Sequence, residues 1–119
     1  MHRKVRAKRQ AALARRATVK ARSTATRAAR RIRRNGTGTL ATHAMAQGLS
    51  RRDAASMVGT LRKIAAKAGV DGIPGRTHAG RRMRDCTRYT PRQVAVIVLH
   101  YKPRRDLFKT CAARLALAA

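Results

Sequence analysis

The sequence predicts an all-α protein in which a basic N-terminal arm precedes a small helical domain of about four helices. The first observation behind this prediction is the apolar pattern, which follows the 3.6-residue period of a helix in several segments. The second is a change of composition near Asn35-Gly36. Residues 1–34 contain 14 Lys or Arg and no acid, whereas residues 35–119 contain 16 Lys or Arg and four Asp. We therefore assign residues 1–36 to the arm and residues 37–119 to the domain.

The arm is locally compatible with a helix. It lacks Gly and Pro and is rich in Ala and Arg until Asn35-Gly36 supplies a helix stop signal. Its larger apolar side chains are too sparse for a continuous stripe, and cations surround the whole cylinder. We expect the arm to be mostly disordered alone in water and to form one long helix against phosphate groups.

We interpret the arm as a nucleic-acid-binding segment. The alternatives are a solvated tail without a partner and an organelle transit peptide, which the basic excess beyond the arm argues against. The predicted contact residues are Arg3, Lys4, Arg6, Lys8, Arg9, Arg15, Arg16, Lys20, Arg22, Arg27, Arg30, Arg31, Arg33 and Arg34.

Residues 37–68 predict a helical hairpin. Leu40, Ala44 and Met45 indicate a short first helix, and Gly48-Leu49 forms a turn. The segment from Ser50 to Asp53 has the form of a capping box that begins a second helix. That helix follows the 3.6-residue period up to Gly69 through Ala54, Met57, Val58, Leu61, Ile64, Ala65 and Ala68.

Residues 69–89 predict a basic loop, and a short β-wing is the weaker alternative because β-branched residues are few. Thr90-Pro91 then has the form of an N-cap followed by proline at the first helical position, so a third helix begins there and ends before Pro103. A last helix covers about residues 104–117. The segment 90–118 is therefore a C-terminal helical hairpin, and the domain contains two such hairpins joined by the basic loop.

The charge of the chain indicates its partner. It carries 30 Lys and Arg against four acids, a formal net charge of +26. Such a charge opposes compaction by self-repulsion unless a partner neutralises it, so we expect a nucleic acid. The acids show no local clustering, which argues against acid-base pairs, two-metal chemistry and calcium sites. We therefore expect no enzyme activity and no cofactor.

The sequence predicts no membrane partner. No run approaches the roughly 18 apolar residues that a membrane span needs, and no signal-peptide pattern is present. We expect a cytoplasmic protein located on the nucleoid. A homodimer is compatible with the sequence, which does not decide the oligomeric state.

The segment from Leu40 to Gly59 fits the helix-turn-helix pattern, because Ala44 is small at the helix crossing and Gly48 allows a left-handed turn. The alternative is an ordinary helical hairpin whose arginines are solvated. In the helix-turn-helix interpretation, the second helix presents its first turns to the major groove. The residues predicted to contact DNA there are Ser50, Arg51, Arg52, Ser56 and Thr60.

Two further basic segments are predicted to contact nucleic acid. Arginine on a glycine-rich backbone suits phosphate contacts or insertion into a narrow minor groove, with a solvated basic loop as the alternative. A cluster at the start of the last helix could seat a phosphate, because the helix N-terminus adds positive potential. The predicted residues are Arg76, Arg81, Arg82, Arg84, Arg88 and Arg92 in the loop region, and Arg104 and Arg105 in the cluster.

The turn Gly48-Leu49-Ser50-Arg51-Arg52-Asp53-Ala54 is similar to a Gly-Leu-Ser-basic-basic-Asp-Ala turn in the HU/IHF family of nucleoid-associated DNA-bending proteins. Residues 39–64 as a whole resemble the first helical hairpin of that family. The resemblance implies a hairpin that builds a dimer body and β-arms that enter the minor groove. After Gly69 we find no β-rich sheet and no Asn-Pro arm tip, so the resemblance supports the hairpin rather than DNA bending.

Other chemistry finds little support. Aromatic residues are too few for base-stacking platforms. His78, Cys86, His100 and Cys111 lack the paired close spacings of structural zinc sites, so we expect no metal. Tyr89 as a strand-transfer nucleophile and Cys86 as a reactive thiol are minor alternatives. We expect double-stranded DNA rather than RNA as the partner of a transcription regulator or architectural protein, with a structural RNA-binding protein of ribosomal type as the alternative.

Overall fold

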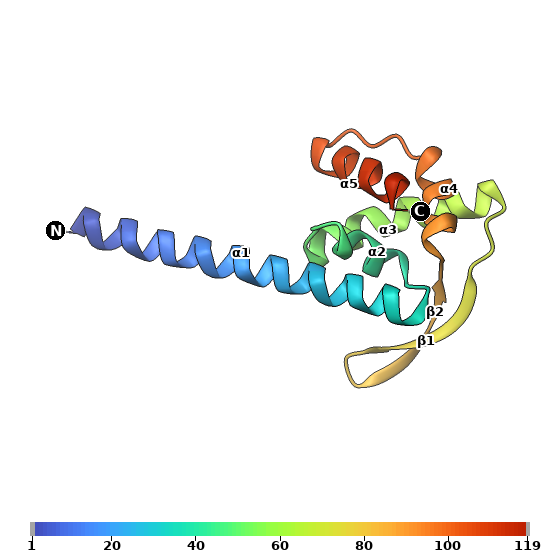
Figure 1. Cartoon of the computed structure of the whole chain (residues 1–119), viewed down its shortest axis with the longest axis horizontal. Helices are drawn as coiled ribbons and strands as arrows, with labels where there is room; N and C mark the ends of the chain where they lie inside the picture. Colours follow the sequence, from blue (N-terminus) through green and yellow to red (C-terminus); the bar gives the residue numbers. More distant parts are fainter. Residues whose placement is uncertain (1, 119) are drawn as a thin grey trace.

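The computed structural model describes residues 2–118, which form five α-helices and one two-stranded antiparallel sheet. In chain order the elements are α1 (His2–Asn35), α2 (Leu40–Ala46), α3 (Arg51–Ala68), β1 (Ile73–Ala79), β2 (Arg82–Arg88), α4 (Pro91–Leu99) and α5 (Asp106–Leu117). Figure 1 shows α1 as a long rod whose C-terminal end meets a body built from α2 to α5, with the sheet projecting from the body. The molecule measures 60 × 34 × 22 Å along its principal axes.

The mostly helical architecture is confirmed, but the basic loop predicted at residues 69–89 is wrong, and the weaker alternative, a short β-wing, is what forms. This segment forms a β-hairpin in which Arg76 pairs with Asp85 and Ala79 pairs with Arg82. The two strands turn at Gly80-Arg81, where Gly80 has a φ of 70°. The hairpin stands out from the body and most of its side chains are exposed, so it does not need the β-branched residues that a half-buried strand usually contains.

The ends of the helices follow the predicted capping signals. The Ser50 hydroxyl accepts a hydrogen bond from the Asp53 backbone N–H at 3.2 Å, and Gly69 ends α3 in the left-handed conformation. Thr90 and Gln93 form a complete capping box at the start of α4. The predicted bounds 51–68 are therefore confirmed, whereas α5 begins at Asp106, two residues later than predicted.

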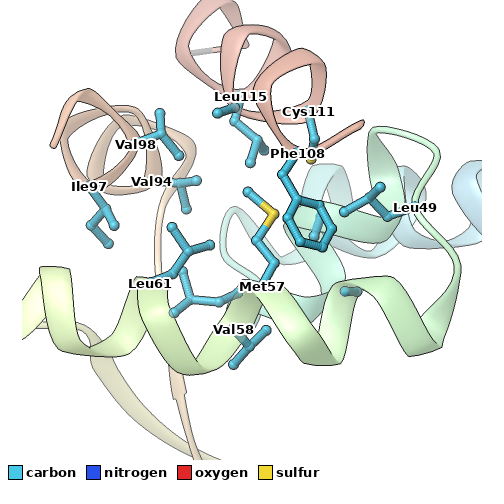
Figure 2. Packing of buried hydrophobic residues seen from close by; sticks show 14 of the residues in the cluster. Leu49, Met57, Val58, Leu61, Val94, Ile97, Val98, Phe108, Cys111 and Leu115 are labelled. Carbon is cyan, nitrogen blue, oxygen red and sulfur yellow. The ribbon is translucent and has the colours of Figure 1, made fainter. Parts of the chain in front are cut away.

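The core lies between α3 and the C-terminal helical hairpin. Figure 2 shows Met57 and Leu61 of α3 pointing towards Val94 of α4 and Phe108 of α5. Met57 and Leu61 are at most 1% exposed. The periodic apolar positions predicted in α3, except the exposed Ala68, thus form the inner face of the helix, and its other face is left to solvent.

A short bridge connects the sheet to the helices. The backbone N–H of Tyr89 donates to the Gly38 carbonyl at 2.8 Å, and the Gly38 N–H donates back to the Tyr89 carbonyl at 3.0 Å. Gly72 lies so close to the end of β2 that a Cβ there would sit 2.8 Å from the Arg88 carbonyl oxygen and 2.9 Å from the Tyr89 ring. Both contacts fix where the hairpin leaves the body, directly after α3.

Only the C-terminal part of α1 packs on the body. Ala28 is buried and Ile32 is half-buried in the contact between α1 and α2, whereas residues 3–22 are exposed. The helix ends at Asn35, as predicted, and Gly36 follows with a φ of 73°. The helical form of the arm is thus present in the structure, and its disorder in water without a partner stays a prediction.

Candidate nucleic-acid interface

The outward face of α3 is the centre of the candidate interface. The predicted residues of this helix are exposed, as is the N-cap residue that precedes it: Ser50, Arg51, Arg52, Ser56 and Thr60. Along this face the small residues Ala55 and Gly59 leave room for a surface to approach the backbone. The face is therefore both cationic and low in relief, which is the form that a helix needs to enter a groove.

Sequence reasoning missed three cations of the same helix. Lys63 follows Arg52, Ser56 and Gly59 at spacings of four, three and four residues, so it lies on the same exposed stripe. Lys67 continues the stripe by one more turn, and Arg62 lies on its flank. The helical period of the sequence already places Lys63 and Lys67 on this stripe. The prediction, however, covered only the first turns of the helix.

The hairpin places a second set of arginines beside α3. Arg82, Arg84 and Arg88 alternate along β2 and therefore share one face of the sheet. A groove of about 780 Å³ separates this region from the helices and is lined by Arg84 of β2, Arg62 and Val58 of α3, and residues at the start of α2. The structure thus brings together cations that are more than 20 positions apart in sequence.

Two of the predicted hairpin arginines also stabilise the hairpin. Arg76 pairs with Asp85 across the strands at 3.6 Å, and Arg88 donates a hydrogen bond to the Arg76 carbonyl at 3.2 Å. Arg81, Arg82 and Arg84 lie at or near the tip, are exposed and take part in no ion pair within the described residues. These three side chains are therefore available to an external anion.

The predicted cluster at the start of α5 lies next to the start of α3. The Arg105 guanidinium is 3.8 Å from the Asp53 carboxylate and stacks 4.7 Å from the centre of the Phe108 ring. Arg104 is exposed and has neither contact. Arg105 thus joins the two helix starts, while Arg104 extends the exposed cationic surface. Arg92 is exposed on the first turn of α4.

Where α1 packs on the body, its cations lie away from the side that contacts α2. All 14 are exposed, but the side of α1 that contacts α2 consists of small and apolar residues, including Ala25, Ala28 and Ile32. The expectation that cations surround the whole cylinder is therefore wrong for this side. Since α2 packs on both α1 and α3, the surfaces of the arm and of α3 are distinct.

The acids neutralise little of the charge. Three of the four Asp form ion pairs, which involve Arg76, Arg105 and Lys109 among 30 Lys and Arg. All three pairs are at least partly open to solvent, where such pairs contribute at most about 1 kcal/mol each. Within the described residues, most of the positive charge therefore has no acidic partner and must be balanced from outside the chain.

The side chains with nucleophilic groups that the sequence singled out, those of Tyr89 and the two cysteines, are buried or half-buried. Tyr89 is 7% exposed, and its backbone is paired with Gly38, which gives it a structural role at the base of the hairpin. Cys111 lies in the core, where burial raises the pKa of its thiol to about 11. Cys86 is half-buried in the groove beside Arg84. Residues 2–118 contain no cluster of three or more His, Cys, Asp or Glu with the geometry of a metal site.

Comparisons of the chain with protein-family models, with curated proteins and with solved structures found no match. None of the helices in the described part of the chain is long and apolar enough to cross a membrane. The resemblance of residues 39–64 to the HU/IHF hairpin thus rests on the turn sequence alone. The β-hairpin after α3 matches the short β-wing that was the weaker alternative for this segment, and its tip is Gly80-Arg81.

Proposed function

We propose that the protein binds double-stranded DNA through the outward face of α3 and the adjoining β-hairpin. The observation that carries the proposal is the juxtaposition of two exposed cationic elements, α3 and the β-hairpin, which meet at one groove lined by Arg62 and Arg84. A helix-turn-helix followed by a β-wing has this order of elements.

The dimensions of the two grooves of DNA suit the two elements. The major groove, about 12 Å wide, admits a helix, and α3 would enter it with Arg52 and Ser56 towards the base edges. Lys63 and Arg62 would then lie near phosphates. The hairpin tip, with Arg81 and Arg82, would reach the minor groove or its phosphates, where a guanidinium fits a narrow groove.

The residues of the DNA-binding surface would have two different roles. Contacts to phosphate oxygens position a protein, and contacts to base edges specify the sequence. We assign base contacts to the first turns of α3 and phosphate contacts to the hairpin tip, Arg104 and the arm. A location on the nucleoid and a role as an architectural protein or transcription regulator follow from the proposal.

Competition between duplex DNA and duplex RNA of equal length tests the proposal. The deep, narrow major groove of A-form RNA excludes a helix, so DNA should displace RNA at equal salt. In the double variant Arg52→Ala/Lys63→Ala, DNA binding should weaken by about tenfold or more while RNA binding changes less. Lys109→Ala is the matched control, since Lys109 is exposed on α5 and already paired with Asp106.

A preference for duplex RNA would instead support a structural RNA-binding protein. In that case the long exposed part of α1 would be expected to pack within folded RNA. If the double variant lost affinity for DNA and for RNA equally, α3 would contact only phosphates and would have no role in the major groove.

A further inference from the structure

Most cations of α1 lie in two rows along the helix. Members of each row are separated by 3, 4, 7 or 11 residues, which are nearly whole numbers of helical turns. The first row consists of Arg6, Arg9, Arg16, Lys20, Arg27, Arg31 and Arg34, and the second of Lys4, Lys8, Arg15, Arg22 and Arg33. At 3.6 residues per turn the rows stand about 130° apart around the axis. They contain 12 of the 14 cations of the arm.

The two rows divide the circumference of α1 into a narrow side and a wide side. The wide side is nearly free of charge. It contains Ala7, Ala11, Ala14, Thr18, Ala21, Ala25, Ala28 and Ile32, which alternate at steps of four and three residues. The last members of this series contact α2, and Ala28 is 3% exposed. The contact with α2 therefore fixes the rotation of the helix, and both rows face away from the body.

A narrow strip of short, uncharged side chains separates the two rows on the solvent side. Val5, Ala12, Val19 and Ser23 form it, and Val5 and Val19 are 51% and 65% exposed. Only Arg30 interrupts the strip, near its C-terminal end. No acid occurs in α1. Two exposed apolar side chains between two rows of cations are thus left without any partner in the described part of the chain.

We propose that α1 lies lengthwise in the major groove of duplex DNA, with one row of cations on each phosphate backbone. The proposal rests on the proposed function, since it requires duplex DNA as the ligand. A helix with its side chains is about 10–12 Å in diameter, which matches the roughly 12 Å width of the major groove and exceeds the roughly 6 Å of the minor groove. The two rows of cations flank one face of α1, as the two phosphate backbones of the duplex flank its major groove.

The strip between the rows would face the base edges. Its methyl groups can contact the C5-methyl group of thymine, and its side chains offer few hydrogen-bond donors or acceptors for reading bases. The arm would therefore bind with high affinity and low sequence selectivity, by contacts to both strands. A disordered tether of equal charge would bind through the same number of cations in any arrangement, so the arrangement itself can be tested.

The test is a swap of cations between faces in the full-length protein. The swap variant carries Arg9→Ala with Ala11→Arg, Arg16→Ala with Ala14→Arg, and Lys20→Ala with Ala21→Lys. Composition and net charge are unchanged, and all six positions are exposed, so no packing contact is lost. The control variant carries Arg9→Lys, Arg16→Lys and Lys20→Arg, which keeps the first row cationic.

The measured quantity is the slope of log Kobs against log salt concentration for a short DNA duplex. Each phosphate contact contributes about 0.9 to this slope, so the swap variant should lose about 2 to 3 of it, and the control should lose none. Affinity at moderate salt should fall at least tenfold in the swap variant. The difference between wild type and swap variant should persist when netropsin fills the minor groove.

The outcomes separate the two proposals. Equal slopes and affinities for wild type and swap variant would show that the arm is a diffuse tether, which overturns the placement of α1 and leaves DNA binding intact. Loss of the difference in netropsin would overturn the groove assignment. If wild type itself shows no salt-dependent binding to duplex DNA, both proposals fail. A second swap, Lys8→Ala with Ala7→Lys and Arg22→Ala with Ala21→Arg, keeps the test valid should the first variant lose helix content by circular dichroism.

Discussion

The exposed part of α1 and the body of the molecule are stabilised by different forces. Residues 3–22 bury no side chain, and no tertiary contact compensates the mutual repulsion of their cations. In the body a continuous cluster of buried residues joins α2, α3, α4 and α5, and the ion pairs are few. The arm therefore depends on counter-charge, and the body depends on apolar burial. A given change in solution or sequence should therefore affect one of the two regions much more than the other.

The largest expected effect is that of salt on the arm. If α1 and the hairpin make about 6 to 10 phosphate contacts, affinity for DNA falls by about 10³ to 10⁵ between roughly 50 and 200 mM salt. Removing residues 2–22, which pack on nothing in the described structure, should flatten that dependence while the thermal unfolding of the body stays unchanged. Binding isotherms at several salt concentrations check this. A dependence equally steep without these residues would contradict the electrostatic role of the arm.

Truncation of a buried side chain should affect only the body. Leu61 is 1% exposed between α3 and the C-terminal helices, so Leu61→Ala should lower the free energy of unfolding by about 2–5 kcal/mol through the cavity that it leaves. Leu13→Ala is the matched change in the arm, where the side chain is 63% exposed, and it should shift stability by less than about 0.5 kcal/mol. Chemical denaturation of both variants makes the comparison. Similar losses would mean that the arm shares the core.

A smaller effect should distinguish base readout from phosphate binding on α3. Arg52 lies on the outward face opposite the buried stripe, so Arg52→Ala should leave the fold intact. If its guanidinium bonds a guanine, the variant should lose about 1–3 kcal/mol on a selected site and much less on random duplex. Competition binding on both duplexes measures the ratio. Equal loss on both would assign Arg52 to a phosphate, and α3 would then position the protein without reading sequence.

Local signals in the sequence were sufficient for the helices of the body. Ser50 and Gly69 bound α3, and Thr90-Pro91 begins α4, because capping depends on neighbouring backbone groups that the sequence specifies directly. The hairpin was only the weaker alternative from the sequence, for the opposite reason. Its strands contain Arg, Gly and Pro, and they are held in place by the bridge of Tyr89 to Gly38, which lies 51 positions away in the chain.

Long-range contacts also decide which cations can face a ligand. Arg104 and Arg105 are adjacent cations that the sequence does not distinguish. In the structure, only Arg105 contacts Asp53 and Phe108. Similarly, the side of α1 that turns inward is fixed by α2, and without that contact the rows of cations have no defined direction. Periodicity in the sequence can group residues on one face of a helix, and only packing shows where that face points.

The smallest expected effect concerns pH and is confined to the body. His43 is 3% exposed, and its Nε2 lies 2.7 Å from the Tyr89 carbonyl, which can only accept, so Nε2 is the donor. Burial lowers the pKa of His43 below its usual 6.5, and its hydrogen bonds to the Tyr89 and Gly38 backbones oppose the shift without cancelling it. The unfolded chain therefore takes up a proton more readily than the folded one. Stability should be level above about pH 6.5 and should decline as the pH falls below it.

His43→Gln isolates this effect, because the glutamine amide can donate to the same carbonyl and does not titrate. Between pH 7 and pH 5.5, the melting temperature of wild type should fall further than that of the variant. The comparison cancels contributions from His78 and His100, which are exposed in both proteins. Helix content in α1 gives an internal reference, since residues 3–22 are exposed and remote from His43. Equal declines in both proteins would show that the acid sensitivity arises from general charge repulsion, which acts on the arm and body alike, and not from the buried imidazole.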